Sequence, residues 1–373
     1  MAGALSGIRV ADFSRVLAGP YATMLLADLG AEVFKVERPP LGDDTRQWGP
    51  PFDADGVATY FSSINRNKRS LVIDLATDAG RAEARQLIAT CDVVVENFVP
   101  GTMERFGLGF DALSAGHPGL VYASISGFGR TPEAAALPGY DLLVQAVGGL
   151  MSITGPDPGS PTKVGVALVD VITGLHCAFG ILAALRHRDA TGEGQRVDVT
   201  LLGSLLSAMV NQSAAYVGAG VVPRAMGNAH PSIAPYEVFD TADRALAMAV
   251  GNDGQFRHCV SALGLPALAD DERFATNPAR VRHRTELRRL LQERLRTQGA
   301  DAWAQSLTAV GVPCGPVNTM DEAFALARTL GLDPVQQVGG TPTVAHPIAF
   351  SRTPAEYRLR PPSVGDTTLP EVL

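Results

Sequence analysis

Two acidic residues set 29 positions apart, Asp141 and Asp170, carry most of what this sequence says about chemistry. Asp141 follows Gly139 and Tyr140, and Asp170 lies where an apolar run turns into the pattern of a long apolar helix. A carboxylate at a helix start can serve as an N-cap, an acceptor for free backbone N–H groups. The pattern alone therefore predicts that Asp170 caps a helix, with catalysis as the alternative, and that Asp141 opens another helix.

The bulk composition indicates a well-packed protein and excludes some partners. Of 373 residues, 46% are hydrophobic and 18% are charged, which argues against disorder. This length suggests two or three domains. The net charge of −7 disfavours nucleic acid as a partner, because a phosphate backbone needs a basic surface. A local cluster of arginines and lysines could still hold an anionic ligand.

The spacing of cysteines and histidines predicts no metal site. The four cysteines form no C-x-x-C pair and the seven histidines form no H-x-x-x-H pair. The N-terminus runs directly into a strand pattern without a signal segment. The longest apolar helical stretch, 171–185, is too short to span a bilayer. We therefore expect a protein of the reducing cytoplasm with no membrane span.

The first half of the chain alternates strand and helix patterns. The predicted strands are 8–13, 32–37, 70–75, 92–96, 119–126 and 196–199, and the predicted helices are 18–29 and 78–90. From Ile172, apolar residues recur at helical spacing through Leu175, Phe179 and Leu182. Strands that alternate with helices indicate β-α-β units and an α/β fold with a parallel, Rossmann-like sheet.

The residue pattern changes after this region, and this change predicts a second domain. We assign 1–215 to a large α/β domain that the C-terminal segment 325–373 completes, and 216–324 to a smaller α+β domain. A basic helix is predicted over 280–296. Its leucines, Leu287, Leu290, Leu291 and Leu295, form a buried stripe, so its arginines indicate a solvated face and not a nucleic-acid surface.

Positive charge gathers near the predicted strand ends, where open α/β sheets bind ligands. The residues are Arg38, Arg66, Lys68, Arg69 and Arg105. Converging cations would suit a polyphosphate ligand, although each one alone reads as an ordinary surface charge. The turn at 15–20 lacks the G-x-G-x-x-G pattern that dinucleotide binding requires, which disfavours a nicotinamide enzyme.

Eight segments spread over nearly the whole chain form an ordered series. They are 8–37, 42–46, 65–70, 96–101, 139–141, 192–195, 311–318 and 347–351. In order and spacing this series resembles the family III (CaiB/BaiF) CoA-transferases. The resemblance implies an enzyme that moves CoA from an acyl-CoA to a carboxylic acid, with no cofactor bound covalently at rest. It also implies an interlocked homodimer.

The resemblance assigns roles to individual residues. It implies that Asp170 is a nucleophile that becomes an aspartyl-CoA thioester, and that Asp141 supports it. A helix N-terminus stabilises an anion, so cap and nucleophile are compatible readings of Asp170. The residues implied to bind CoA are Arg38, Asn65, Arg66, Lys68, Arg69, Asn97, Arg105 and Tyr140. Those implied to contact the acyl substrates are Arg15, Leu17 and His230.

Finer features favour one substrate class and leave two alternatives. The segments 15–20, 48–52, 149–156 and 229–236 resemble the succinate–hydroxymethylglutarate members, which implies succinyl-CoA as the donor. Leu17 stands where formyl-CoA transferases have glutamine, which disfavours formate and oxalate. The first alternative is an α-methylacyl-CoA racemase, whose relatives carry a histidine where this chain has the weakly basic Tyr140. The second is a CoA-binding protein without catalysis, for which Asp170 would be dispensable.

Overall fold

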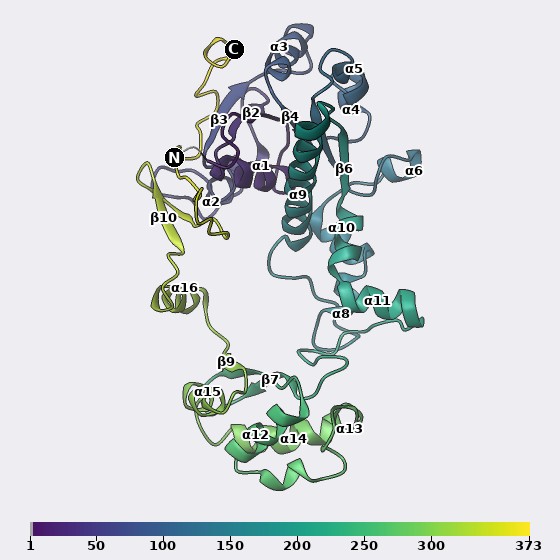
Figure 1. Cartoon of the computed structure of the whole chain (residues 1–373), viewed down its shortest axis with the longest axis vertical. Helices are drawn as coiled ribbons and strands as arrows, with labels where there is room; N and C mark the ends of the chain where they lie inside the picture. The colour runs from purple at the N-terminus through teal and green to yellow at the C-terminus, as the bar shows by residue number, and fades with distance from the viewer. Residues whose placement is uncertain (1–2) are drawn as a thin grey trace. The chain divides into compact units, whose positions relative to one another are not determined.

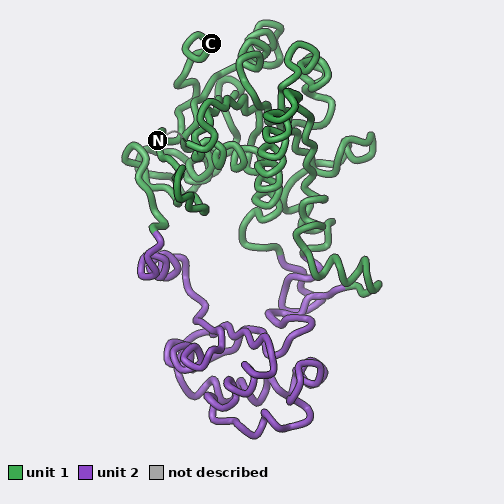
Figure 2. The backbone as a smooth tube through the Cα atoms, in the orientation of Figure 1, with its two compact units in different colours: residues 1–150, 163–222, 333–373 green, residues 151–162, 223–332 purple. Residues whose placement is uncertain are grey.

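The computed structural model describes residues 3–373, which form two compact units (Figure 2). Unit 1 comprises the chain up to Leu150 together with Lys163–Val222 and Asp333–Leu373. Unit 2 comprises Met151–Thr162 and Pro223–Leu332. Each unit encloses hydrophobic core of its own, on both faces of a sheet in unit 1 and in one cluster in unit 2.

Unit 1 is built on a six-stranded parallel sheet with the strand order β3-β2-β1-β4-β5-β6. The strands are β1 (Arg9–Asp12), β2 (Glu32–Glu37), β3 (Lys68–Val72), β4 (Val93–Glu96), β5 (Val121–Ser126) and β6 (Arg196–Thr200). This order is that of a doubly wound Rossmann sheet, in which the strand order reverses between β1 and β4. The predicted parallel α/β sheet is confirmed. The third strand was placed wrongly, because it begins with the charged residues Lys68 and Arg69, which a hydrophobic pattern leaves out.

Helices cover both faces of this sheet, because neighbouring residues of a strand point to opposite sides. In β2, Val33 belongs to one core cluster and Phe34 to the other. The first cluster packs under α1 (Ala18–Asp28), α9 (Leu168–Thr191) and α10 (Leu201–Ala208) (Figure 1). The second packs under α3 (Asp78–Ala89), α4 (Thr102–Arg105) and α5 (Phe110–Ser114).

Shorter elements complete unit 1. They are α2 (Thr59–Ser62), α6 (Pro132–Ala135), α7 (Asp141–Val147), α11 (Val210–Ala219), the hairpin β10 (Val335–Val338) and β11 (Thr341–Val344), and 3₁₀ turns at Asp44–Gln47 and Leu369–Glu371. The helix α8 (Leu150–Ile153) lies at the boundary of the two units. The C-terminal segment binds the chain just before β3: Asn67 donates its N–H to the carbonyl of Leu359, and Arg358 donates its N–H to the Asn67 side chain.

Unit 2 has a three-stranded antiparallel sheet in the order β7-β8-β9. Its elements are β7 (Tyr236–Asp240), β8 (Ala245–Ala249), β9 (Cys314–Pro316), α12 (Asp253–Ala262), a 3₁₀ turn at Pro266–Ala269, α13 (Asn277–Arg282), α14 (Arg284–Leu295), α15 (Ala300–Ala309) and α16 (Met320–Thr329). The single basic helix predicted over 280–296 is wrong, because the helix breaks at His283. Arg280 is also fully buried, where it donates to the carbonyls of Ala234 and Phe274.

The helix α9 is longer than predicted, with 24 residues. By length and composition it could cross a membrane, although a core helix passes the same test. Eight of its residues are buried, and Cys177 and Ile181 belong to the core cluster beneath the sheet. The helix ends where Gly192 adopts a left-handed conformation. Its packing on the sheet therefore accounts for the apolar residues on its buried face.

Arg66 forms a buried ion pair in unit 1, and its replacement tests how much that pair stabilises the fold. Its guanidinium pairs with the buried carboxylate of Asp28 at 2.6 Å, so Arg66→Ala should lower the free energy of unfolding by about 3–5 kcal/mol, because a buried charge loses its partner. Urea denaturation measures the loss. The control is Arg289→Ala, whose pair with Glu293 is exposed and should be worth less than about 1 kcal/mol. Equal losses in the two variants would contradict this interpretation.

Candidate active site

A cavity of about 380 Å³ opens in unit 1 at the carboxyl ends of β1 and β4. The chain leaves these neighbouring strands in opposite directions, which is the place where ligands bind in open α/β sheets. Residues predicted to form the site share the lining of this cavity. They are Arg15, Leu17, Asn97, Tyr140, Asp141 and Asp170. The structure thus brings together the two aspartates and four of the predicted contact residues.

The carboxylate of Asp141 holds the first turn of α9. Its Oδ1 accepts the N–H of Val169 at 2.8 Å and the N–H of Asp170 at 3.3 Å. These N–H groups lie in the first turn of the helix and have no carbonyl partner within it. Asp141 therefore acts as a cap from another helix, which places the two aspartates side by side.

The predicted N-cap role of Asp170 is wrong. The N-cap position is Ala167, and Asp170 is the third residue of α9, so it lies inside the first turn. Asp141 supplies the acceptor that an N-cap side chain would supply. The side chain of Asp170 is therefore left to face the cavity, where it remains at the positive end of the helix dipole.

Gln145, which the sequence analysis did not single out, orients Asp141. One turn further along α7, its side-chain N–H donates to Asp141 Oδ2 at 2.7 Å. Its carbonyl oxygen accepts the N–H of Val164 at 2.9 Å. The fully buried amide thus connects α7 with the segment that leads into α9. A glutamine in a helix carries no sequence signal for such a contact.

The environment of Asp170 favours its protonated form. Burial, and then the neighbouring charge of Asp141, raise its pKa to about 7. The same two carboxylates also affect Tyr60. Burial of its ring, and then the charges of Asp170 and Asp141, raise the pKa of the phenol to about 12. A carboxyl group that titrates near neutrality is more basic than an ordinary aspartate and is still available as an anion.

A second, smaller cavity of about 240 Å³ adjoins the ends of β2 and β3. Arg15 and Arg38 line it together with apolar side chains, among them Phe13, Ile73, Leu75, Phe98 and Phe106. The guanidinium of Arg38 is half exposed and pairs with Asp44. An apolar recess beside two arginines suits an aromatic ring that carries phosphates.

The other predicted binding residues do not face these cavities. Asn65, Arg66 and Lys68 are buried and already paired, Arg66 with Asp28 and Lys68 with Asp12. The sequence pattern led us to expect exposed cations at these positions, whereas Arg66 and Lys68 form buried ion pairs. Arg69 and Arg105 are exposed and line neither cavity. His230 belongs to unit 2, where its carbonyl accepts from Arg284.

Comparison with known proteins places this geometry in a family. Residues 5–368 match CoA-transferase family III. The chain belongs to that family. It is therefore a CoA-transferase that uses acyl-CoA as its substrate.

Individual relatives match over most of their length. The chain is 47% identical to the succinate–glutarate CoA-transferase of Agrobacterium fabrum, with 97% of this chain and 93% of the relative aligned. It is 40% identical to the human succinyl-CoA:glutarate CoA-transferase, over 99% of this chain and 86% of the relative. The crystal structure of a CaiB/BaiF family protein from Brucella suis matches with a TM-score of 0.88 and 42% identity, covering 98% of this chain and 97% of that one.

The environment of Asp170 predicts a pH-dependent stability difference. Its folded-state pKa, about 7, lies above the ordinary value of 3.8, so the stabilisation is present below 3.8 and is lost as the pH rises through 7. The stability gap between Asp170→Asn, which stays neutral, and the wild type should therefore be smaller at pH 5 than at pH 8, with the variant the more stable of the two. Urea denaturation at both values measures this.

Two further variants make this measurement specific. In an Asp141→Asn background the gap at pH 8 should shrink, because the second cause of the shift is gone. Asp111→Asn, at an exposed helical position, removes a charge outside the cavity and should open no such gap. A wild type as stable as Asp170→Asn at pH 8 would contradict the shifted pKa.

Proposed function

We propose that this enzyme transfers CoA from succinyl-CoA to a dicarboxylic acid of about the size of glutarate, through a covalent intermediate on Asp170. The observation that carries the proposal is a carboxyl group with a pKa of about 7 in a cavity at the carboxyl ends of β1 and β4. The names of the relatives from Agrobacterium fabrum and human support the choice of succinate and glutarate.

The reaction needs four displacements. The Asp170 carboxylate attacks the thioester carbon of succinyl-CoA, and CoA leaves as the thiolate, which gives a mixed anhydride. The thiolate attacks the Asp170 carbonyl carbon, releases succinate and forms the aspartyl-CoA thioester. The acceptor carboxylate attacks this thioester to give a second anhydride and thiolate. The thiolate then attacks the acceptor carbon, which forms the new acyl-CoA and restores the Asp170 carboxylate.

The contacts of Asp170 suit these steps. Because Asp141 and the start of α9 are joined by two hydrogen bonds, the nucleophile has a fixed backbone position. The positive end of the helix dipole stabilises the anion that develops on each attacked carbonyl. The raised pKa makes the ionised carboxylate a stronger nucleophile than an exposed aspartate.

Arg15 is the residue that we assign to the second carboxylate of the substrates. It lines both cavities, and its Nε is buried with no hydrogen-bond partner among the described residues. Its pairing with Asp44 at 3.5 Å is loose. A guanidinium with an unsatisfied N–H favours a carboxylate ligand. We place the adenine and phosphates of CoA in the second cavity, beside Arg38.

The racemase alternative finds little support at the position that would decide it. Tyr140 precedes α7 as its N-cap residue, and it is 66% exposed. A phenol is too weakly basic at neutral pH to remove an α-proton readily.

The four cysteines are all free, and we infer from these thiols a reducing, cytoplasmic compartment.

Incubation with succinyl-CoA and glutarate tests the proposal, with new acyl-CoA followed by mass. Wild type should form glutaryl-CoA, and hydroxylamine should convert the intermediate to a hydroxamate at Asp170. Asp170→Ala should lose at least about 10³-fold in kcat, because the covalent step needs the carboxylate. Full turnover by Asp170→Ala would overturn the mechanism. Exchange of an α-proton without acyl exchange would instead identify a racemase.

The same assay with Arg15→Met tests substrate selection. The KM for glutarate should rise more than that for a monocarboxylate of equal length, since only glutarate loses an ion pair. An equal rise for both acids would remove Arg15 from this role.

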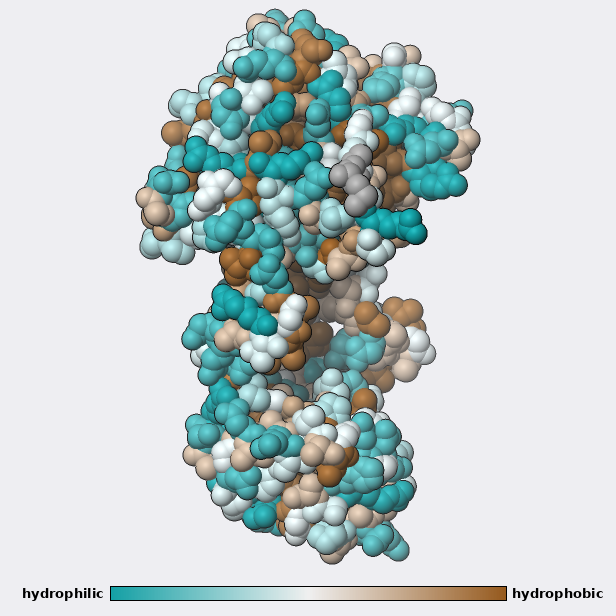
Figure 3. Space-filling model, turned by 60° about the vertical axis from the view of Figure 1, so that its left-hand side comes forward, coloured by the Kyte–Doolittle hydropathy of each residue, from teal (hydrophilic) through white to brown (hydrophobic). Residues whose placement is uncertain are grey.

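We further propose that the enzyme is a homodimer, interlocked as the family resemblance implies. The stripe Leu175, Phe179 and Leu182 on α9 is exposed, and Phe179 is 75% accessible. The helix α11 also exposes Tyr216 and Val217. Other hydrophobic side chains also reach the surface, as in the view of Figure 3. Apolar stripes of this kind mark protein interfaces.

Light scattering tests the assembly. Wild type should show twice the mass of the chain, and Phe179→Asp should shift the mass toward one chain, because a charge would be buried in the interface. Leu41→Asp changes an exposed apolar side chain in a loop and serves as the control. A monomeric wild type would refute the dimer.

A further inference from the structure

The wall of the larger cavity contains a residue in an unfavourable conformation. Val16 has a φ of +68°, in the left-handed region that β-branched residues rarely adopt. It lies between β1 and α1, and Val16, Leu17 and Ala18 all line the cavity that contains Asp170. Such a conformation persists only where the surroundings hold it.

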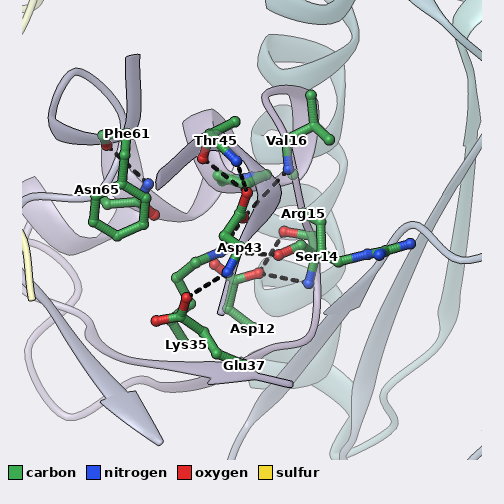
Figure 4. Close-up of polar contacts among 12 residues, drawn as sticks. Asp12, Ser14, Arg15, Val16, Lys35, Glu37, Asp43, Thr45, Phe61 and Asn65 are labelled. Atoms are coloured by element: carbon green, nitrogen blue, oxygen red, sulfur yellow. Dashed lines mark hydrogen bonds and ion pairs between the residues drawn. The ribbon is translucent and has the colours of Figure 1, made fainter. Parts of the chain in front are cut away.

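Three side chains from other parts of unit 1 hold this loop. Asn97 accepts the N–H of Arg15 at 2.9 Å and donates to its carbonyl at 2.7 Å. Lys35 donates to the carbonyl of Ser14 at 3.1 Å. Asp43 accepts the N–H of Val16 at 3.3 Å and so binds the strained residue itself (Figure 4).

Asp43 is itself held firmly. Lys35 donates to Asp43 Oδ2 at 2.8 Å, and both side chains are at most 1% exposed. Thr45 donates its N–H and its hydroxyl to Asp43 Oδ1 at 2.9 and 2.7 Å. The Asp43 N–H donates to Glu37 at 2.7 Å. The carboxylate that accepts the Val16 N–H is therefore held at both oxygens, by Lys35 at Oδ2 and by Thr45 at Oδ1, as Figure 4 shows.

Stability alone gives a weak reason for this arrangement. A buried ion pair can often be replaced by packed apolar side chains without loss of stability. The reason is that the free energy lost when two charges leave water is about as large as the free energy gained from their attraction. Lys35 also lies under the loop that forms the cavity wall, with a contact to Ser14. The buried pair of Asp43 and Lys35 is therefore explained better by the loop conformation that it fixes than by a contribution to the free energy of folding.

We propose that Asp43 is a positioning residue for CoA transfer: together with Lys35 it keeps Val16 left-handed and so fixes the cavity wall beside Asp170. This inference rests on the proposed role of Asp170 as the nucleophile. When the charge of Asp43 is lost, Val16 relaxes toward extended backbone and the wall moves. A displacement of about 1 Å at a reacting group can cost ~100-fold in rate.

The conformation of Val16 provides a test that a purely structural role would not pass. Glycine adopts positive φ without strain, so Val16→Gly should keep the wall in place without help from Asp43. We expect Asp43→Asn to lower kcat for glutaryl-CoA formation by roughly 10–100-fold, with a smaller change in the KM for glutarate. In the double variant Val16→Gly/Asp43→Asn, kcat should recover by about 10-fold over Asp43→Asn.

Several controls keep the result interpretable. Asp28→Asn breaks another buried pair, with Arg66, and should lower stability without lowering kcat. If Asp43→Asn does not fold, Thr45→Val weakens the support more gently, by one hydroxyl, and Val16→Gly should again restore kcat. A double variant no faster than its Asp43 or Thr45 single variant would overturn the positioning role.

The same samples also test the proposed function separately, through formation of the hydroxamate at Asp170. Wild type and Val16→Gly should both give the Asp170 hydroxamate with succinyl-CoA and hydroxylamine. If they do and rescue fails, Asp43 is not a positioning residue, while the nucleophile stands. If neither gives the hydroxamate, the proposed nucleophile is wrong, and the positioning role that rests on it is overturned as well.

Discussion

The contact on which the site depends is the one between a carboxylate and the free N–H groups at the start of a helix. Asp141 takes the place of an N-cap for α9, although it belongs to α7. This leaves Asp170 without the capping role and places two carboxylates beside each other. Burial, and then the repulsion between the two carboxylates, raise the pKa of Asp170 to about 7. One hydrogen-bonded contact therefore sets the position of the side chain and contributes to its basicity.

Three other buried acids around the strand ends are held differently. Burial opposes the ionisation of Asp12, Glu37 and Asp43, but lysine or arginine partners keep the pKa of each below its usual value. For Asp170, burial and Asp141 act in the same direction, and no cation among residues 3–373 offsets them. Unit 1 thus has acids that serve as fixed supports and, in the cavity lining, an acid that can change its charge.

The fold was predictable to the extent that it follows from local patterns. Alternating strands and helices, with a glycine after α1, identified the parallel sheet, and β2 has the predicted ends. Charged residues were interpreted less well. Lys68 and Arg66 read as surface cations because charge is rarely buried, and only their distant partners, Asp12 and Asp28, make burial possible. Such pairs leave no trace in sequence spacing.

The two aspartates of the cavity were named from the sequence, but their contacts were not. The family resemblance led to Asp170, whereas periodicity assigned it the wrong position in the helix. Leu168 and Val169 open α9 without a polar signal, so the start of the helix could not be located. The contributions of Gln145 and Asp43 depend on partners 19 and 27 residues away, which only the folded chain brings close.

The length of α9 has a mechanical consequence. Asp170 and Phe179 belong to one uninterrupted helix and are nine residues apart, or about 14 Å at 1.5 Å per residue. Because the helix is rigid and packed along the sheet, force applied at its exposed stripe is transmitted to the carboxylate without a hinge between them. A displacement of the helix at that stripe would therefore also move Asp170, so sequence changes far outside the cavity would reach the carboxylate without altering any residue that lines it.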